Sequence, residues 1–394
     1  MRDERDLVLR NARAHDDGRR LDLRLAGGVV REVGTAGSLD GRVVVDLDER
    51  TLLPALVNAH DHLDFSTFPF LGRPPYASVY DWSADVNAGA GDARAVAALA
   101  VPLADRLFLG GLRNLLAGVT AVAHHGPFHR SLAREDFPTW VLERYQFAHS
   151  PGLTPQLKRT YRSTDRRIPW MIHAAEGTDE RSRAEVKDLA RQRLLRHNVV
   201  LVHAIGVDAD DVAGLAAAGA CVVWCPESNR NLYGATADVR GLRAAGVRIG
   251  LGSDSPVSGV RDALSNLAAA GREGVCDAKE LIELATRGSG ETARLPVGGL
   301  EVGARADLLA VTSLDALVSG DRTAVELVVR EGRPVYGTPA LAGSVLPAGD
   351  ALAVDGQARR LARGLGRRAA SIVKAHPRGR GAAWMSGLEL GSFD

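Results

Sequence analysis

His60 and His62 lie one residue apart at the end of an apolar run, residues 52–59. The run is typical of a short strand, in which side chains at positions i and i+2 point to the same side. Both imidazoles can therefore reach one ion. A His-x-His pair alone is weak evidence for a metal site, because surface histidine pairs also occur by chance.

Three later strand-like runs also end in a histidine or an aspartate. They cover residues 170–172, 199–202 and 247–252 and lead to His173, His203 and Asp254. Imidazole and carboxylate groups suit Zn²⁺ or Fe²⁺, with one position left open for water. A bound divalent cation lowers the pKa of such a water molecule, so that hydroxide is available near neutral pH. The pattern predicts a hydrolytic metal site.

Glu176 lies three residues beyond His173, in the loop that follows the strand. A carboxyl group in that position can carry a proton from water to a leaving nitrogen. Any one of these polar residues alone is more simply explained as a partly buried side chain with a satisfied hydrogen bond. Their shared position at strand ends favours a catalytic site.

The elements that must position these residues alternate along the middle of the chain. Between residues 53 and 301, strand-like runs alternate with helix-like segments, as in a parallel α/β fold. Seven strands are clear, and an eighth is expected between residues 126 and 169. We therefore predict a (β/α)8 TIM-like barrel, distorted at its third and fourth strands because the chain there is too short for two regular units. Active sites of such barrels lie at the C-terminal ends of the strands.

Further strand-like runs flank the barrel. Residues 1–52 and 302–344 contain short alternating runs separated by Asp-Gly and Gly-Gly turns, which predicts a small β-sandwich domain built from both chain ends. Residues 345–394 form an appended tail. Within it, residues 354–375 predict a basic amphipathic helix that packs on the barrel or on a second subunit, with a membrane-surface role as the alternative.

The motifs resemble those of the amidohydrolase superfamily, in particular its metal-dependent deaminase and chlorohydrolase branch, with the cytosine and guanine deaminases and the triazine hydrolases. The resemblance covers roughly residues 6–340. It is carried by residues 58–63 (NAHDHL), 173–176 (HAAE), His203, residues 228–229 (SN), 251–254 (LGSD) and 298–308 (GGLEVGARADL).

The resemblance implies a role for each strand-end residue. One metal ion would be bound by His60, His62, His173 and Asp254. Glu176 would be the proton shuttle, His203 would orient the hydroxide or polarise the substrate, and Asp254 would also accept the proton of the attacking water. Binuclear members bridge two metals through a carboxylated lysine or a glutamate. The only lysine between His62 and His173 is Lys158, in a helix-like or loop-like stretch, so one ion is expected, Zn²⁺ first and Fe²⁺ as the alternative.

Substrate contacts are expected from the aromatic stretch after His62 and from polar residues at other strand ends. The candidates are Trp82, His125, His149 and Asn229. The two histidines, together with His124, are equally well explained as hydrogen-bonded core residues.

The leading functional prediction is a metal-dependent hydrolase that acts on a C–N bond of a small polar molecule, foremost by deamination of a heterocycle or cyclic amidine. Ring-opening hydrolysis of a cyclic amide, as in the imidazolonepropionase-like branch, uses the same ligands and stays open. A non-catalytic barrel-type binding protein is the alternative from another class. Such a protein is expected to lose a ligand or the shuttle, and none of the six residues is missing.

The composition limits which classes of binding partner are expected. A net charge of +1 creates no field that would recruit nucleic acid or an acidic membrane, and 45% apolar with 25% charged residues is ordinary for a globular protein. Three scattered cysteines argue against a disulfide framework. The charged start of the chain resembles no signal peptide, and no apolar run reaches the length of a membrane span. We expect a cytoplasmic enzyme with a small-molecule substrate and, by the family resemblance, a homodimer or larger homo-oligomer.

Overall fold

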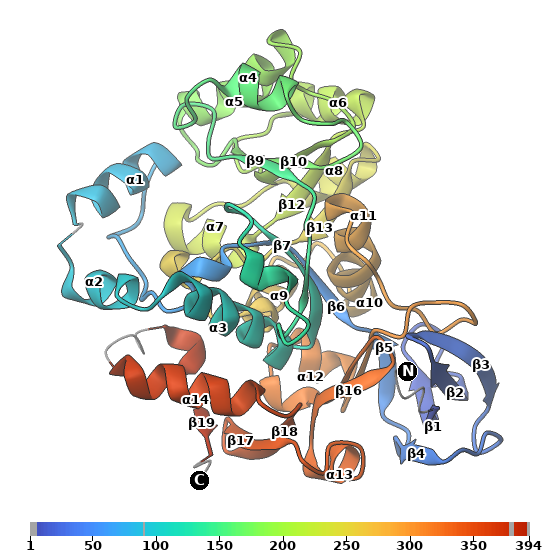
Figure 1. Ribbon diagram of the computed structural model, residues 1–394. Coiled ribbons are helices and arrows are strands. Elements are labelled where there is room, and N and C mark those ends of the chain that lie inside the picture. The colour runs from blue at the N-terminus through green and yellow to red at the C-terminus, as the bar shows by residue number, and fades with distance from the viewer. Residues whose placement is uncertain (1–5, 90, 378–381, 392–394) are drawn as a thin grey trace.

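The structure is a computed structural model that describes residues 6–89, 91–377 and 382–391 (Figure 1). The predicted end segments 1–52 and 345–394 therefore include residues 1–5, 378–381 and 392–394, which lie outside the described residues.

Eight parallel strands in two sheets form the centre of the molecule. One sheet has the order β6-β7-β8 and the other β13-β12-β11-β10-β9, and a parallel bridge between Asp61 and Asp254 links the first strand to the segment after the last. The strands are β6 Leu56–Asp61, β7 Val119–His124, β8 Trp140–Val141, β9 Gln146–Ala148, β10 Trp170–Ala174, β11 Val199–His203, β12 Cys221–Trp224 and β13 Arg248–Leu251. The prediction of an α/β fold with parallel strands is confirmed.

The segment between β7 and β10 differs from the expectation of one strand over residues 140–148. Two short strands form there, because the exposed Glu143 and Arg144 interrupt the apolar run and Tyr145 turns back to donate its hydroxyl hydrogen to the carbonyl oxygen of Gly126 at 2.5 Å. No ladder joins β8 to β9 among the described residues. Closure of the barrel therefore stays a prediction.

Helices follow most of the strands (Figure 1). They are α1 Val79–Ala88, α2 Ala93–Leu99, α3 Leu103–Leu116, α4 Leu157–Arg162, α5 Glu180–Arg191, α6 Ala209–Ala218, α7 Pro226–Tyr233, α8 Val239–Ala244, α9 Ala263–Arg272, α10 Ala278–Glu283 and α11 Ser289–Ala293. The ends of α6 illustrate the local causes. Asp208 and Asp211 form a capping box at its start, and Gly219 ends it in the left-handed conformation.

Pro102 separates α2 from α3, as expected of a residue that lacks a backbone N–H and disfavours helix before it. The two helices meet at 98° and together pass a length and hydropathy test for a bent membrane span, whereas no single helix among the described residues passes it.

Both ends of the chain contribute to one eleven-stranded sheet. Its order is β19-β17-β18-β16-β15-β14-β5-β1-β2-β3, with β4 paired to β1, and the antiparallel β5–β14 ladder joins the two halves (Figure 1). The strands are β1 Leu7–Ala14, β2 Arg20–Ala26, β3 Val29–Thr35, β4 Val43–Asp46, β5 Thr51–Pro54, β14 Leu308–Val311, β15 Val325–Arg330, β16 Arg333–Gly337, β17 Asp350–Val354, β18 Gln357–Leu361 and β19 Leu388–Leu390. The ladders place these strands in a single sheet, and the two-layered sandwich stays a prediction.

The C-terminal tail is wrongly predicted in its first half. Residues 350–361 form the β17–β18 hairpin, which turns at Asp355 and Gly356, both with positive φ as a tight hairpin turn requires. The basic helix begins only at α14, Leu365–Ala375. It lies on α3, where the Arg368 guanidinium stacks 4.1 Å from the centre of the Phe108 ring. Two short helices lie between strands of the large sheet: α12 Leu314–Val318 follows β14, and α13 Pro339–Ala342 follows β16.

Candidate metal centre

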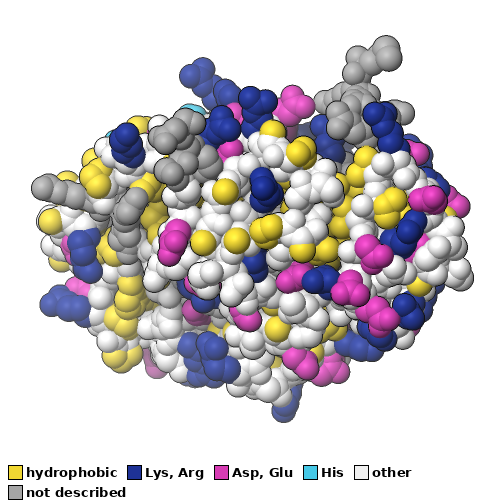
Figure 2. Space-filling view, turned by 90° about the horizontal axis from the view of Figure 1, so that it is seen from below, with side chains coloured by type: hydrophobic (Ala, Val, Ile, Leu, Met, Phe, Trp, Pro, Cys, Tyr) yellow, Lys and Arg dark blue, Asp and Glu magenta, His cyan; other side chains and the backbone are white. Residues whose placement is uncertain are grey.

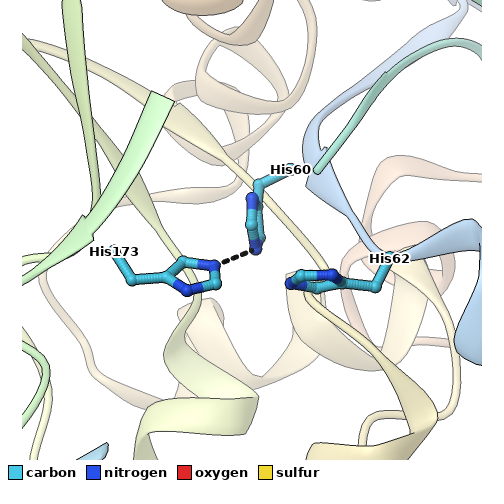
Figure 3. Close-up of side chains that lie close together, drawn as sticks. All are labelled: His60, His62 and His173. Atoms are coloured by element: carbon cyan, nitrogen blue, oxygen red, sulfur yellow. Dashed lines mark hydrogen bonds between the residues drawn. The ribbon is translucent and has the colours of Figure 1, made fainter. Parts of the chain in front are cut away.

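Four side chains from three strand ends meet in the interior. His60 and His62 extend from the end of β6, His173 from β10, and Asp254 follows β13; Figure 3 shows the three rings pointing toward one another. The Nε2 atoms of His60 and His173 are 3.3 Å apart. The Nε2 atoms of His60 and of His62 each lie 3.6 Å from Oδ1 of Asp254. All four residues are at most 9% exposed.

This donor set fits a divalent metal ion. One nitrogen each of His60, His62 and His173 lies within 4.8 Å of the other two. In a second group, one nitrogen each of His60 and His203 and a carboxylate oxygen of Asp254 lie equally close together. Burial, reinforced by neighbouring imidazoles, lowers the pKa of the first three histidines well below the usual value. They are therefore neutral near pH 7 and present lone pairs, the form in which imidazole binds a metal.

Glu176 faces this cluster from the loop after β10. Its Oε1 accepts a hydrogen bond from the Tyr233 hydroxyl at 2.7 Å and lies 3.5 Å from Nε2 of His203. Its Oε2 is buried and has no hydrogen-bond partner among the described residues. Burial raises the pKa of Glu176 to about 7, although His203 and the Tyr233 hydrogen bond act in the opposite direction. A carboxyl group with a pKa near neutrality can both accept and deliver a proton.

His203, at the end of β11, is oriented by Asn229. The ring Nδ1 lies 2.9 Å from the amide oxygen of Asn229, whose own N–H group donates to Thr236 Oγ1 at 3.2 Å. Because the amide oxygen can only accept, Nδ1 carries a hydrogen, and Nε2 is the ring nitrogen that faces Glu176. The sequence predicts Asn229 as a substrate contact, and in the structure its contacts are with His203 and Thr236.

The other predicted substrate residues, His125, His149 and Trp82, differ in how they lie relative to the histidines of the centre. The ring of His125 stacks on that of His173, with centroids 4.2 Å apart, and its Nε2 lies 3.0 Å from the carbonyl oxygen of Ala148. His149 is exposed and meets His173 edge-on, with centroids 5.2 Å apart. Trp82 is half-buried in α1 and donates its indole N–H to the carbonyl oxygen of Leu71. Among the described residues, no hydrogen bond or aromatic ring pair joins Trp82 to the histidines.

A buried polar network supports the centre from behind. Asp61, the last residue of β6, lies between His60 and His62 and accepts from Arg113 at 2.5 Å and from Asn114 at 2.7 Å, both on α3. Ser253, next to Asp254, donates to the same carboxylate at 3.2 Å. Burial raises the pKa of Asp61 to about 6, with Arg113 opposing the shift. The network ties β6, α3 and the Asp254 segment together. No sequence motif predicted this network, although Arg113 and Asn114 in the otherwise apolar second half of α3 were a usable signal.

The aromatic stretch after His62 covers the centre. The ring of Phe65 stacks on that of His62, with centroids 5.4 Å apart. Further along, the N–H of Leu71 donates to the carbonyl oxygen of Val257, and that of Tyr76 donates to the carbonyl oxygen of Leu232. The stretch is therefore attached to the 3-10 turn that follows Asp254 and to the end of α7, and it forms a wall of the site.

Comparison with known proteins gives a consistent result. The model of the amidohydrolase family matches residues 51–335. A 5-methylthioadenosine/S-adenosylhomocysteine deaminase of Haloarcula marismortui is 28% identical over 351 residues, which cover 73% of this chain and 79% of the relative. A protein of the same description from Natronomonas pharaonis is 33% identical over 171 residues, 39% of each chain. The match thus spans about two fifths of that relative's length.

Solved structures of similar fold include an adenosine deaminase from Xanthomonas campestris with bound zinc. It has a TM-score of 0.68 and 19% identity, and the superposition covers 84% of this chain and 92% of that one. Triazine and atrazine hydrolases are also among the similar structures. The resemblance indicated by the motifs is confirmed, and with a family match over most of its length the chain belongs to the amidohydrolase family.

Proposed function

We propose that this chain is a hydrolytic deaminase that removes an amino group from a heterocycle or cyclic amidine. The convergence of His60, His62, His173 and Asp254 beside the buried carboxyl group of Glu176 carries the proposal. The relatives named as deaminases and the zinc-bound adenosine deaminase of similar fold support it.

Each of these residues has a separate role in the proposed reaction. A divalent ion held by His60, His62, His173 and Asp254 would supply a water molecule of lowered pKa. The carboxylate of Asp254 accepts a hydrogen bond from Ser258 at Oδ2, at 2.7 Å, which leaves Oδ1 toward the centre to take the proton of the attacking water.

His203 and Glu176 complete the proton path. Because Nδ1 of His203 donates to Asn229, Nε2 accepts a hydrogen bond from the attacking water and orients it. Glu176 holds a proton at its free oxygen, Oε2, and delivers it to the leaving nitrogen, which departs as ammonia; Glu176 then regains the proton that Asp254 took from the attacking water.

We further propose one Zn²⁺ ion in a closed eight-stranded barrel. Lys158, the one lysine between His62 and His173, is exposed on α4, which supports a mononuclear centre. Zinc in the adenosine deaminase of similar fold supports the choice of metal. The proposal includes a cytoplasmic homo-oligomer with a small-molecule substrate. On the face seen in Figure 2, basic and acidic side chains are interspersed, which supports the proposal that nucleic acid is not a partner.

The test combines elemental analysis with a screen for ammonia release from purines and their nucleosides, pyrimidines, pterins, triazines and cyclic guanidines. We expect about one zinc per chain and ammonia from at least one class, with activity lost on treatment with dipicolinate and restored by Zn²⁺. Metal with a ring-opened product and no ammonia would replace deamination by cyclic-amide hydrolysis. Protein that purifies and works without any metal would overturn the site itself.

A further inference from the structure

Tyr233 is the last residue of α7 and is only 5% exposed. Its hydroxyl donates to Oε1 of Glu176 at 2.7 Å. Burial, together with the adjacent carboxylate, raises the pKa of the Tyr233 hydroxyl well above its usual value, so the group is a permanent donor near neutral pH. No sequence motif indicated this residue.

The structure holds both partners of this hydrogen bond from their backbones. The N–H of Tyr76 donates to the carbonyl oxygen of Leu232 at 2.8 Å, next to Tyr233. The N–H of Val79 donates to the carbonyl oxygen of Glu176 at 3.0 Å. Residues 76–79 therefore bind the loop that carries Glu176 and the helix end that carries Tyr233, which keeps the two side chains in register.

The hydrogen bond makes the two carboxyl oxygens of Glu176 unequal. Oε1 is occupied by a donor that is held in place, since Tyr233 is buried and the backbone of the preceding residue, Leu232, accepts from Tyr76. A carboxyl group whose one oxygen accepts from a hydroxyl carries its own proton on the other oxygen. That oxygen, Oε2, is buried and without a partner among the described residues.

We propose that Tyr233 is a positioning residue for the proton shuttle: it fixes the rotamer of Glu176 and assigns proton transfer to Oε2. The inference rests on the proposed hydrolytic function and deepens it. Without the hydroxyl, the carboxyl group can rotate, and its proton can reside on either oxygen. The reacting geometry is then populated only part of the time, which lowers turnover without weakening substrate binding.

The test is a double-mutant cycle with Tyr233→Phe and Glu176→Gln in the zinc-loaded enzyme. Tyr233→Phe is expected to lower kcat by about 10- to 100-fold, the effect of losing a hydrogen bond to an ionised group, while KM changes by less than about threefold. Because Tyr233 acts through Glu176, the same substitution in the Glu176→Gln background should change kcat by less than about twofold.

Tyr161→Phe is the matched control. Tyr161 is also a buried tyrosine whose hydroxyl donates to a side chain, Asn198 at 3.4 Å, but it lies on α4, away from the centre. It should leave kcat unchanged. An equal decrease in kcat from Tyr233→Phe in both backgrounds, or an increase in KM with kcat unchanged, would overturn the assignment.

A crystal structure of the zinc-loaded Tyr233→Phe variant provides a readout that does not depend on activity. The Glu176 carboxyl group should occupy more than one rotamer there and a single rotamer in the parent protein. If the parent enzyme hydrolyses none of the compounds screened, the proposed function fails, and this comparison still decides the role of Tyr233. A single unchanged rotamer in the variant would refute it.

Discussion

Burial gives the carboxyl group of Glu176 a pKa close to neutrality, which an exposed glutamate does not have. The same cause acts on the imidazoles of the centre in the opposite sense, because burial disfavours their cationic form and leaves their lone pairs available. The chemistry therefore depends on where side chains lie as much as on which side chains they are.

Replacing Glu176 with Gln should retain the metal and lower kcat by about 10²- to 10⁴-fold, because glutamine keeps the shape of the side chain and cannot carry the proton. Metal content and steady-state kinetics measure both effects. Glu227→Gln is the matched control, since burial also raises the pKa of Glu227 to about 7 but its partner is Ser265, outside the centre. Equal rates for the two variants would remove Glu176 from the mechanism.

Glu227 also predicts a pH dependence of stability. Its pKa in the folded protein, about 7, lies above its ordinary value of 4.5, so the folded state binds more protons between these two pH values. Stability therefore falls as pH rises through this window. Glu227→Gln removes the part of the pH dependence that Glu227 causes. The free energy of unfolding of the variant, relative to that of the parent, should therefore increase as the pH is raised from about 5 to 8. Parallel stability curves would contradict the assignment.

At the scale of elements, a short antiparallel contact connects the aromatic stretch to the loop of Glu176. Ser78 forms a bridge with Gly177, and the N–H of Thr178 donates to the carbonyl oxygen of Ala77. Gly177 has a φ of +155°, and a Cβ added there would lie 2.5 Å from the carbonyl oxygen of Ala77. Only glycine allows this approach.

Replacing Gly177 with Ala should therefore lower the free energy of unfolding by about 1–3 kcal/mol and reduce kcat by displacing Glu176. Gly214→Ala is the control. Gly214 lies inside α6 with no atom within 4 Å of the added methyl group, so alanine should stabilise the protein by about 0.5–1 kcal/mol. Denaturant unfolding distinguishes the two. A stable, fully active Gly177→Ala variant would show that the contact is dispensable.

At the scale of the whole molecule, the C-terminal tail returns to the aromatic stretch. Trp384 is 1% exposed, and its indole N–H donates to the carbonyl oxygen of Ser66 at 2.7 Å. Arg322, which forms an ion pair with Asp355 in the β17–β18 turn, donates to the carbonyl oxygen of Trp384. The tail thus joins the large sheet to the segment that follows His62.

Trp384→Ala should lower the free energy of unfolding by about 3–5 kcal/mol, because it leaves a large cavity between these parts. Trp384→Phe keeps most of the buried area and should cost less, mainly the hydrogen bond to Ser66. Thermal or denaturant unfolding of both variants measures the difference. A loss below about 1 kcal/mol for the alanine variant would show that the tail is not part of the folded core.

The sequence by itself indicated the family and the strand ends, because both depend on local order. An apolar run followed by a polar residue predicts a strand end wherever the strand later lies, and Pro102 and Gly219 mark helix boundaries through their own backbone properties. The sequence wrongly predicted one continuous strand over residues 140–148 and a helix that begins at residue 354 instead of Leu365, because local order alone does not decide these features. The hydrogen bond from Tyr145 to Gly126 helps to break the strand, and the β17–β18 ladder forms the hairpin; both contacts belong to the folded chain.

Only the tertiary structure decided which side chains support the centre. Tyr233 reaches Glu176 across 57 residues, and Arg113 reaches Asp61 across 52. No periodicity connects such pairs, since their contact depends on how loops and helices pack. Burial, which sets the pKa of Glu176 and the protonation of the histidines, is likewise a property of the assembled fold. The order of residues determined the chemical groups available, and packing decided their partners and charge states.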